Sequence, residues 1–376
     1  MIFVKILYFY CGEGLGHTTR VIAAGKALER EHEVVYASYG YAKTFAEQSG
    51  LNVEECPGEL ELSGKNGQFD ISKSILTTIK KTKPLNLIKY NRLINKHKPD
   101  LVLSDSFFAP AYLAKQKHIP TWMLLNQTNI SQFFNASQRT SVHMIGGLVR
   151  RVNFSTLEKM DKVLVTDFAP PYTVCRDSLY FTPKLYERTE YIGPLVRKQG
   201  YELPQKKATK TVHSTIGGFG YRAQLLNKII EVSKNMPDYK FNIVAGPNAK
   251  IETHNKNVKT YGSVLDQISL MNEASVIING GGHSAMMESV CLGKPILSAP
   301  DAFHTEQEGN ANGIQRLGIG YRIEYKTPTS LLETLIRELS ESKEIHKKSK
   351  HLQKLAEKND GRKEIVKLAK EFSQTL

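Results

Sequence analysis

The sequence predicts an α/β protein with two Rossmann-like, doubly wound domains in series. Three observations predict this fold class: 376 residues suit two domains, short apolar runs alternate with amphipathic stretches, and a Lys-rich stretch without apolar periodicity divides the chain. That stretch, 197–210, is the expected linker. We expect the first domain over 1–196, the second over 211–358, and a helix over 359–376 that packs back on the first domain.

The apolar runs are the expected strands of two parallel sheets, because runs this uniformly apolar are typical of strands covered by helices on both faces. In the first domain they are IFVKILYFYC, EVVYASYG, LNVEEC, DLVLSDS, PTWMLLNQ, DKVLVTD and TEYIGP. In the second domain they are KTVHSTIGG, KFNIVAG, NVKTYG, SVIINGGG, KPILSAP and GYRIEY. Amphipathic stretches such as Thr18 to Arg30 and Phe107 to Lys117 predict intervening helices, and 329–376 has helical periodicity with a break near Gly361.

Composition narrows the class of protein. Apolar residues at 40% and charged residues at 23% are typical of globular chains and disfavour disorder, collagen and coiled coil. The four cysteines are far apart and form no C-x-x-C pair, which fits a reducing, cytosolic setting. The N-terminal apolar run is interrupted by Lys5 and reads as a buried strand, not as a signal peptide. The net charge of +14 points to an anionic partner, but the basic stretches lack RNA-binding signatures, so no nucleic acid is expected.

Three glycine clusters each follow an expected strand and open an expected helix: GEGLGH at 12–17, TIGGFG at 215–220 and NGGGHS at 279–284. Such turns present backbone N–H groups and a helix N-terminus, which attract phosphate. The first cluster has His17 where a dinucleotide fingerprint needs its third glycine, and no cluster ends in Gly-Lys-Ser or Gly-Lys-Thr. A nicotinamide dehydrogenase and a P-loop ATPase are therefore disfavoured. The helix beginning near Ser284 would meet a diphosphate without a metal ion, and no cofactor is expected.

The stretch NGGGHSAMMESVCLGKPILSAPDAFHTEQEGNANGIQRLG, from Asn279 to Gly318, resembles the donor-binding signature of GT-B glycosyltransferases. This group includes the bacterial MurG enzyme, the plant galactolipid synthases and the UDP-glucuronosyltransferases. GEGLGHTTR and TIGGFG resemble the loops that open the family's two domains, and GPLVR, at Gly193 to Arg197, resembles the segment that ends the first. The resemblance implies the GT-B fold, with the two domains facing each other across a cleft. The interval 51–99 shows little of this resemblance.

The resemblance also implies roles for individual residues. Glu288 would accept hydrogen bonds from both ribose hydroxyls, with an ordinary solvated helix carboxylate as the alternative, and Glu306 and Gln307 would read hydroxyls of the donor sugar. Plant and animal UDP-sugar enzymes have a histidine at the position of Gly280, and His283 falls where they have a bulky aromatic residue, so a phosphate-binding role does not carry over to it directly. The expected donor-binding residues are Gly217, Gly218, Val264, Gly281, Gly282, His283, Ser284, Ala285, Glu288, Glu306, Gln307 and Asn310.

His17 is the expected catalytic base. An inverting glycosyl transfer needs a group that takes the proton of the acceptor hydroxyl, and neutral imidazole titrates near neutral pH. The first loop, with Gly14 and Gly16 on the acceptor side, ends at His17 and should face the cleft. Asp105, at the end of a neighbouring expected strand, resembles the aspartate that partners the base in several family members and would fix the imidazole tautomer. The alternatives are a structural histidine and an aspartate that caps the helix from Phe107.

Basic charge gathers in the first domain. The interval from Ile71 to Pro99 holds eight Lys and Arg residues and no acidic residue, with Leu and Ile between them, and predicts a pair of amphipathic basic helices. The segment 130–154 combines apolar side chains with Arg150 and Arg151. These features suit an anionic membrane surface, with solvated helix faces over an ordinary core as the alternative.

The leading functional hypothesis combines these features. It is a metal-independent, inverting transferase that moves a hexose or N-acetylhexosamine from a UDP-sugar to a hydroxyl of a lipid-linked or otherwise hydrophobic acceptor. It would act in the cytosol, peripherally at the inner face of the cell membrane. A nucleotide-sugar hydrolase or epimerase of the same fold is the second interpretation, and a non-catalytic, basic membrane-binding protein is the third.

Overall fold

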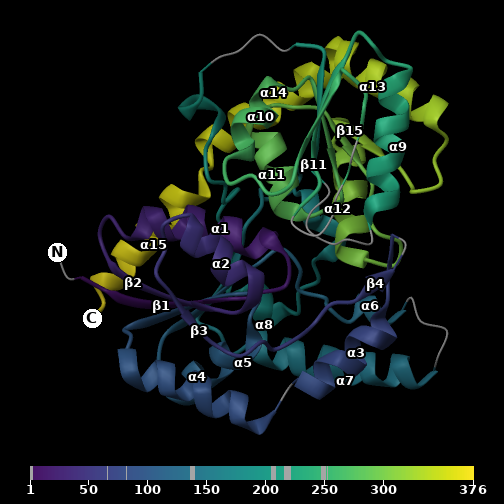
Figure 1. Cartoon of the computed structure of the whole chain (residues 1–376). Coiled ribbons are helices and arrows are strands. Elements are labelled where there is room, and N and C mark those ends of the chain that lie inside the picture. Colours follow the sequence, from purple (N-terminus) through teal and green to yellow (C-terminus); the bar gives the residue numbers. More distant parts are fainter. Residues whose placement is uncertain are drawn as a thin grey trace.

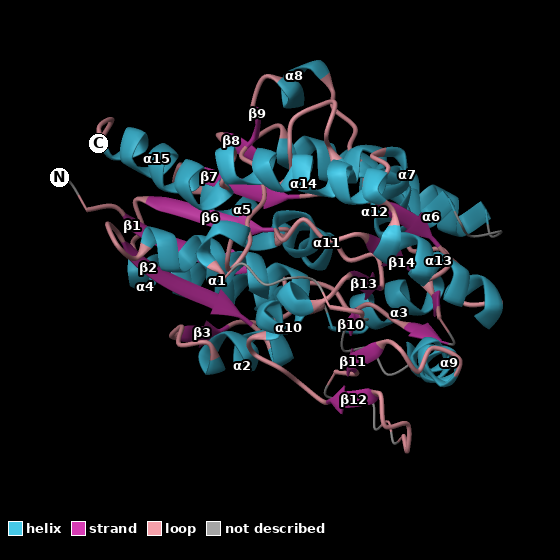
Figure 2. Cartoon of the chain, turned by 90° about the horizontal axis from the view of Figure 1, so that it is seen from above, coloured by secondary structure: helices cyan, strands magenta, loops and turns pink. Residues whose placement is uncertain are grey.

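The computed structural model describes residues 3–65, 67–81, 83–135, 140–204, 209–215, 222–246, 251 and 253–376. Two α/β domains lie one above the other in Figure 1, and the view from above in Figure 2 shows helices around the strands of each sheet. Both larger sheets are entirely parallel, so the expected fold class with two doubly wound domains is confirmed.

The first domain is built on a seven-stranded parallel sheet in the order β3-β2-β1-β6-β7-β8-β9. Its strands are β1 (Lys5–Tyr10), β2 (Glu33–Ser38), β3 (Val53–Glu55), β6 (Leu101–Asp105), β7 (Thr121–Leu125), β8 (Lys162–Val165) and β9 (Thr189–Tyr191). Each corresponds to one of the expected apolar runs. The sequence analysis did not anticipate a short antiparallel hairpin, β4 (Gly64–Lys65) and β5 (Gln68–Phe69), within the poorly matched interval.

Helices connect these strands and cover the sheet. They are α1 (Leu15–Leu28), α2 (Gly40–Gln48), α3 (Ile71–Lys81), α4 (Pro84–His97), α5 (Phe108–Gln116), α6 (Gln132–Asn135), α7 (Thr140–Leu157) and α8 (Pro183–Tyr186), with the 3₁₀ turns η1 (Val174–Ser178) and η2 (Gly200–Glu202). The expected pair of basic helices is α3 and α4. No helix in the described ranges combines the length and apolar character needed to cross a bilayer.

The second domain has a six-stranded parallel sheet in the order β12-β11-β10-β13-β14-β15. Its strands are β10 (Thr211–Thr215), β11 (Lys240–Val244), β12 (Val258–Tyr261), β13 (Val276–Asn279), β14 (Ile296–Ser298) and β15 (Gly320–Arg322). Its helices are α9 (Ala223–Lys234), α10 (Gln267–Glu273), α11 (His283–Cys291), α12 (Thr305–Arg316), α13 (Thr329–Glu341) and α14 (Lys343–Lys358), and α15 (Gly361–Ser373) ends the chain.

The strand orders position the site. In each sheet the order reverses beside the first strand, between β1 and β6 and between β10 and β13, and ligands of open α/β sheets bind outside the strand ends at such a switch point. The central strands are apolar on both faces because helices cover both. In β1, Ile6 to Tyr10 are fully buried. The polar loops after these strands therefore carry the chemistry.

The C-terminal helices bridge the two domains. On α14, Leu352 and Ala356 pack in one apolar cluster with residues of α11, whereas Ile365 and Leu368 of α15 belong to the core of the first domain. Figure 1 shows α15 lying along α1. A further contact is made by η1, which lies so close to α12 that a Cβ on Gly313 would come within 2.0 Å of a backbone oxygen. The two domains are thus packed together away from the cleft.

Candidate active site

A cavity of about 680 Å³ lies between the two domains. Both domains contribute to its walls, at the C-terminal ends of their parallel strands. Asp105, Gly281 and Asn310 do not line it, and Gly217 and Gly218 lie outside the described residues. The expected residues that line it are Gly14, Gly16, His17, Val264, Gly282, His283, Ser284, Ala285, Glu288, Glu306 and Gln307.

His17 and Asp105 meet at the first-domain wall of the cavity. His17 lies in the first turn of α1, and its Nδ1 is 2.8 Å from Oδ1 of Asp105, the last residue of β6. The Asp105 side chain is fully buried, whereas that of His17 is 23% exposed. Nη2 of Arg20, which only donates, is 2.9 Å from the same Nδ1 of His17, but it already donates to Oδ1 of Asp105 at the shorter distance of 2.6 Å. We therefore assign the Nδ1–H tautomer, because an ionised carboxylate only accepts hydrogen bonds. This tautomer leaves the lone pair of Nε2 available as a base.

A buried arginine completes this pair, and the sequence analysis missed it. Arg20 donates from Nε to Oδ2 of Asp105 at 3.0 Å and from Nη2 to Oδ1 at 2.6 Å. Burial raises the pKa of Asp105, but the charge of Arg20 and hydrogen bonds from His17 and Arg20 outweigh it and lower the pKa to about 2. The carboxylate is therefore ionised at neutral pH. A signal was present: Arg20 is three residues from His17, on the same helix face, and directly precedes the apolar run from Val21 to Ala24.

Hydrogen bonds continue from Arg20 across the cleft. Its Nη1 donates to Oδ1 of Asn126 at 2.8 Å, and Nδ2 of Asn126 donates to Oε1 of Glu306 at 2.8 Å. The same Glu306 oxygen accepts from Nδ2 of Asn310 at 2.8 Å, which also donates to the Gly281 carbonyl at 3.0 Å. Asn310 thus supports the donor loop from behind the cavity wall. Asn126 stands near the end of an expected strand, PTWMLLNQ, as Asp105 does in DLVLSDS, so the same positional argument could have found it.

The turn from Asn279 to Ser284 connects β13 to α11 and forms the opposite wall. Gly281 has a φ of +83°, and a Cβ there would lie 2.8 Å from Cβ of Gln307, so the turn requires glycine. Gly282 is the N-cap residue of α11 and provides no side-chain cap, which leaves N–H groups of the first turn available to an anion. Ser284 donates from Oγ to the Gly16 carbonyl at 2.7 Å and ties the two glycine loops together.

Glu288 lies on α11 and is 2% exposed. Its carboxylate accepts from Nε of Arg197 at 2.8 Å and from Nη2 at 3.3 Å, and Arg197 also donates to the Leu265 carbonyl at 2.7 Å. The Glu288 carboxylate is therefore not the ordinary solvated helix carboxylate that the sequence left open as an alternative. Two accepted hydrogen bonds leave lone pairs for further donors, and both residues line the cavity. The sequence analysis assigned Arg197 only to the closing segment of the first domain.

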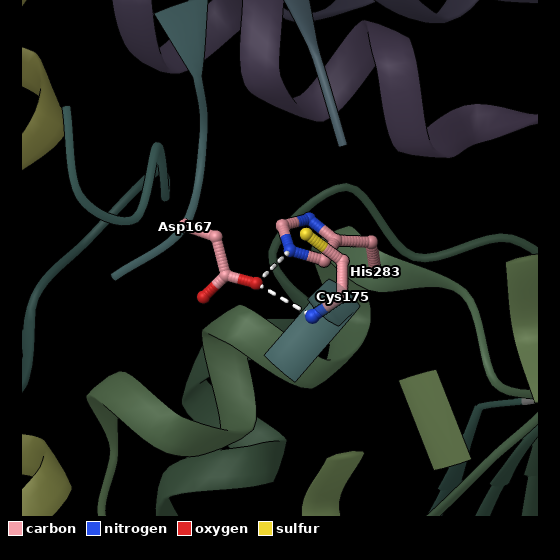
Figure 3. A group of neighbouring side chains, drawn as sticks. All are labelled: Asp167, Cys175 and His283. Atoms are coloured by element: carbon pink, nitrogen blue, oxygen red, sulfur yellow. Dashed lines mark hydrogen bonds and ion pairs between the residues drawn. The ribbon is translucent and has the colours of Figure 1, made fainter. Parts of the chain in front are cut away.

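His283, the first residue of α11, forms a cluster of possible metal ligands with Asp167 and Cys175. Figure 3 shows Oδ2 of Asp167 accepting from Nε2 of His283 at 3.1 Å and from the Cys175 N–H at 2.8 Å. Oδ1 of the same carboxylate accepts from the Phe168 N–H at 2.7 Å. Ligand atoms of Asp167, Cys175 and His283 lie within 4.8 Å of one another, and no other such group occurs among the described residues.

Burial and hydrogen bonds shape the acid–base properties of this cluster. Burial and the charge of Asp167 raise the pKa of the Cys175 thiol well above its usual value. Burial raises the pKa of Asp167, but the hydrogen bond and charge of His283 outweigh it and lower the pKa. Asp167 belongs to the first domain and His283 to the second, so the pair is another contact between the domains.

The rest of the first-domain wall is largely apolar. Ile75 and Ile79 on α3 and Ile145 and Val149 on α7 line it, and Ile79 and Ile145 are also exposed at its rim. The apolar surface of the cavity therefore continues to the outside of the molecule between these two helices. Such a wall suits a hydrophobic ligand.

Comparison with known proteins agrees with this architecture. The model of glycosyl transferase family 1 matches residues 4–340. An uncharacterized glycosyltransferase of Methanosarcina mazei is 38% identical over 371 residues, 97% of each chain. A UDP-N-acetylglucosamine--N-acetylmuramyl-(pentapeptide) pyrophosphoryl-undecaprenol N-acetylglucosamine transferase of a Sulfurihydrogenibium species is 26% identical over 201 residues, 51% of this chain and 57% of its own.

A solved structure shares the whole fold. The glycotransferase of kitacinnamycin superposes with a TM-score of 0.75 at 17% identity, over 99% of this chain and 100% of the other. The GT-B fold is thereby confirmed. Because the family model spans nearly the whole length and close relatives match from end to end, the chain belongs to glycosyl transferase family 1 and is a glycosyltransferase.

Proposed function

We propose that this glycosyltransferase moves a hexose or N-acetylhexosamine from a UDP-sugar to a hydroxyl of a hydrophobic acceptor, with inversion at the anomeric carbon. The observation that carries the proposal is one cavity lined on one side by His17, paired to Asp105, and on the other by the start of α11. The first supplies a base, and the second supplies N–H groups for an anionic leaving group.

The reaction follows from these positions. Nε2 of His17 takes the proton as the acceptor oxygen attacks the anomeric carbon, the bond from that carbon to the diphosphate oxygen breaks, and its electron pair stays on the diphosphate. Asp105 stabilises the imidazolium through Nδ1. The dipole and free N–H groups of α11 stabilise the charge on the diphosphate, so this step requires no metal ion.

Glu288 is the proposed ribose site. Its buried carboxylate, already held by Arg197, has lone pairs left for the two ribose hydroxyls. Two observations support UDP as the nucleotide of the donor: this site for a ribose, and the Sulfurihydrogenibium relative, whose name specifies a UDP-sugar. That relative's acceptor is linked to a lipid, which agrees with the apolar cavity wall here.

The first test is a donor screen. We expect one or two UDP-sugars to raise the melting temperature and to support transfer to a lipid extract, because a bound donor stabilises only the folded state. Glu288→Gln should weaken UDP binding by about 10- to 100-fold, since hydrogen bonds to a charged group are lost. Calorimetry and a radiolabelled-sugar assay measure both effects. The absence of both UDP binding and transfer would contradict the proposal, and release of free sugar without an acceptor would favour a hydrolase.

We also propose that the enzyme works peripherally at an anionic membrane on the cytosolic side. Large apolar side chains are exposed on both helices at the cavity rim, with Leu76 on α3 60% exposed and Met144 on α7 74% exposed. Lys73, Lys80 and Lys89 are exposed on α3 and α4. Apolar insertion and charge attraction thus coincide on α3, one of the helices that line the cavity where a lipid-linked acceptor would enter.

Vesicle binding tests this surface. The protein should sediment with phosphatidylglycerol vesicles at about 0.1 M salt and largely dissociate near 1 M, where the Debye length falls from about 10 Å to 3 Å. UDP binding should change less, because its site is enclosed. Lys80→Glu with Lys89→Glu should reduce sedimentation, whereas Lys354→Glu with Lys358→Glu, the same charge change on exposed positions of α14, should not. Equal losses in both double variants would exclude this surface.

A further inference from the structure

The unexpected hairpin β4–β5 joins the first domain to the donor-sugar loop of the second. The Phe69 N–H donates to the Ala302 carbonyl at 2.9 Å, and the Ala302 N–H donates to the Gly67 carbonyl at 2.9 Å. Figure 1 shows β4 at the boundary with the second domain. Ala302 lies a few residues before Glu306 and Gln307. The hairpin therefore holds the segment that precedes the expected sugar-binding pair.

His304 packs against two phenylalanine rings of the first domain, and the three rings form a triangle. Its ring centroid is 5.2 Å from that of Phe69 and 5.1 Å from that of Phe133, and the two phenylalanine rings are 5.2 Å apart. These are ordinary distances for packed aromatic pairs. All three residues line the cavity, together with Glu306 and Gln307. The imidazole is thus held in one orientation by side chains of the other domain.

The hydrogen bonds of His304 determine which nitrogen carries the proton. His304 is the N-cap residue of α12, and its Nδ1 accepts from the Gln307 N–H at 3.4 Å. Burial lowers the pKa of His304, which keeps the ring neutral at neutral pH. The hydrogen of the neutral ring must then be on Nε2. The residue is only 7% exposed, and no described group accepts a hydrogen bond from Nε2.

We propose that His304 is a donor-specificity residue, whose Nε2–H, held by Phe69 and Phe133, donates to one hydroxyl of the transferred sugar. The inference rests on the proposed function and deepens it, because selection of the sugar then depends on both domains. Glu306 and Gln307 line the cavity beside His304. Gln307 accepts the Asp301 N–H on Oε1, which leaves its NH₂ as a donor, and Glu306 keeps Oε2 as an acceptor. A neutral, fully hydroxylated sugar satisfies this set of donors and acceptors.

A deoxy sugar that lacks the contacted hydroxyl would leave the buried Nε2–H without a partner. A site built to hydrogen-bond a substrate hydroxyl discriminates strongly against an analogue without it. The wild-type enzyme should therefore use one monodeoxy analogue of its preferred donor about 10- to 100-fold less efficiently, in kcat/KM, than the parent sugar.

The experiment compares kcat/KM for the preferred UDP-sugar and its monodeoxy analogues in His304→Asn and in wild type. Asparagine keeps an acceptor for the Gln307 N–H, so α12 retains its cap, but it lacks the Nε2–H. We expect discrimination against one analogue to fall about tenfold or more, with the ratios for the other analogues unchanged. Phe69→Leu removes one of the rings that hold the imidazole of His304 but keeps the imidazole itself. It should therefore lower the discrimination against the same analogue by less. His351→Asn on α14, where the histidine is exposed, is the matched control.

The outcomes separate this inference from the proposed function. If the wild-type enzyme transfers sugar and His304→Asn lowers kcat/KM equally for every donor, His304 is only structural and the inference is wrong. If the wild type neither binds UDP nor transfers any sugar, the proposed function fails. Calorimetric affinities of UDP and UDP-sugar show whether a variant lost the sugar contact or its fold, because UDP binding persists in the first case only.

Discussion

Replacement of His17 with alanine is expected to lower kcat by about 10²- to 10⁴-fold, the usual contribution of a general base, with little change in the KM for the donor. His17 lines the cavity and makes its polar contacts with Asp105 and Arg20. Its side chain is partly exposed, so the variant should fold. Steady-state rates at saturating donor measure the effect.

A matched variant tests whether the loss of rate is specific to His17. His351→Ala, at an exposed histidine of α14, is the control and should match wild type. A near-normal rate in His17→Ala would place the base elsewhere.

Replacement of Arg20 with methionine is expected to destabilise the first domain by about 3–5 kcal/mol, the usual cost of breaking a buried ion pair from one side. Arg20 is 2% exposed, and Asp105 is fully buried. Methionine fills similar space but leaves the Asp105 carboxylate without its cation and leaves Asn126 without a donor. Activity should fall as well, because Asp105 then loses a contact that fixes it against His17.

The effect of pH on this stability follows from the lowered pKa of Asp105, about 2 in the folded protein against about 3.9 in an unfolded chain. The ion pair therefore stabilises the fold above about pH 4, and this contribution is lost as the pH falls from about 4 towards 2. In Arg20→Met the main cation is gone and burial raises the pKa of Asp105, so protonation and the accompanying change in stability should begin at higher pH.

Trp122 makes the measurement specific to the first domain. It is the single tryptophan, lies on β7 and is 2% exposed, so its fluorescence reports unfolding of this sheet in denaturant. Arg337→Met, which removes an exposed ion pair with Asp238 in the second domain, should leave this transition unchanged. Adding Asp105→Asn to Arg20→Met should recover part of the loss, because no buried charge then remains. A wild-type transition in Arg20→Met would refute the role of the pair.

The strands and the chemistry at their ends could be predicted because both depend on local sequence. Continuous apolar runs predicted all thirteen strands of the two parallel sheets, and glycine clusters marked the turns. His17 and Asp105 are 88 residues apart, yet their approach followed from the rule that parallel strands end at one edge. The hairpin β4–β5 was not predicted, because strands of two residues are too short to show an apolar period in the sequence.

The sequence by itself determined the fold class and the family, and it predicted that His17 and Asp105 lie together. Only the tertiary structure decided which distant charges and rings meet: Arg197 of the linker with Glu288, and, across the cleft, Asn126 with Glu306 and Phe69 with His304. The reason is physical. Periodicity and turn chemistry act over a few residues, whereas these contacts join segments that are far apart in the sequence, and their formation depends on how the two domains pack together.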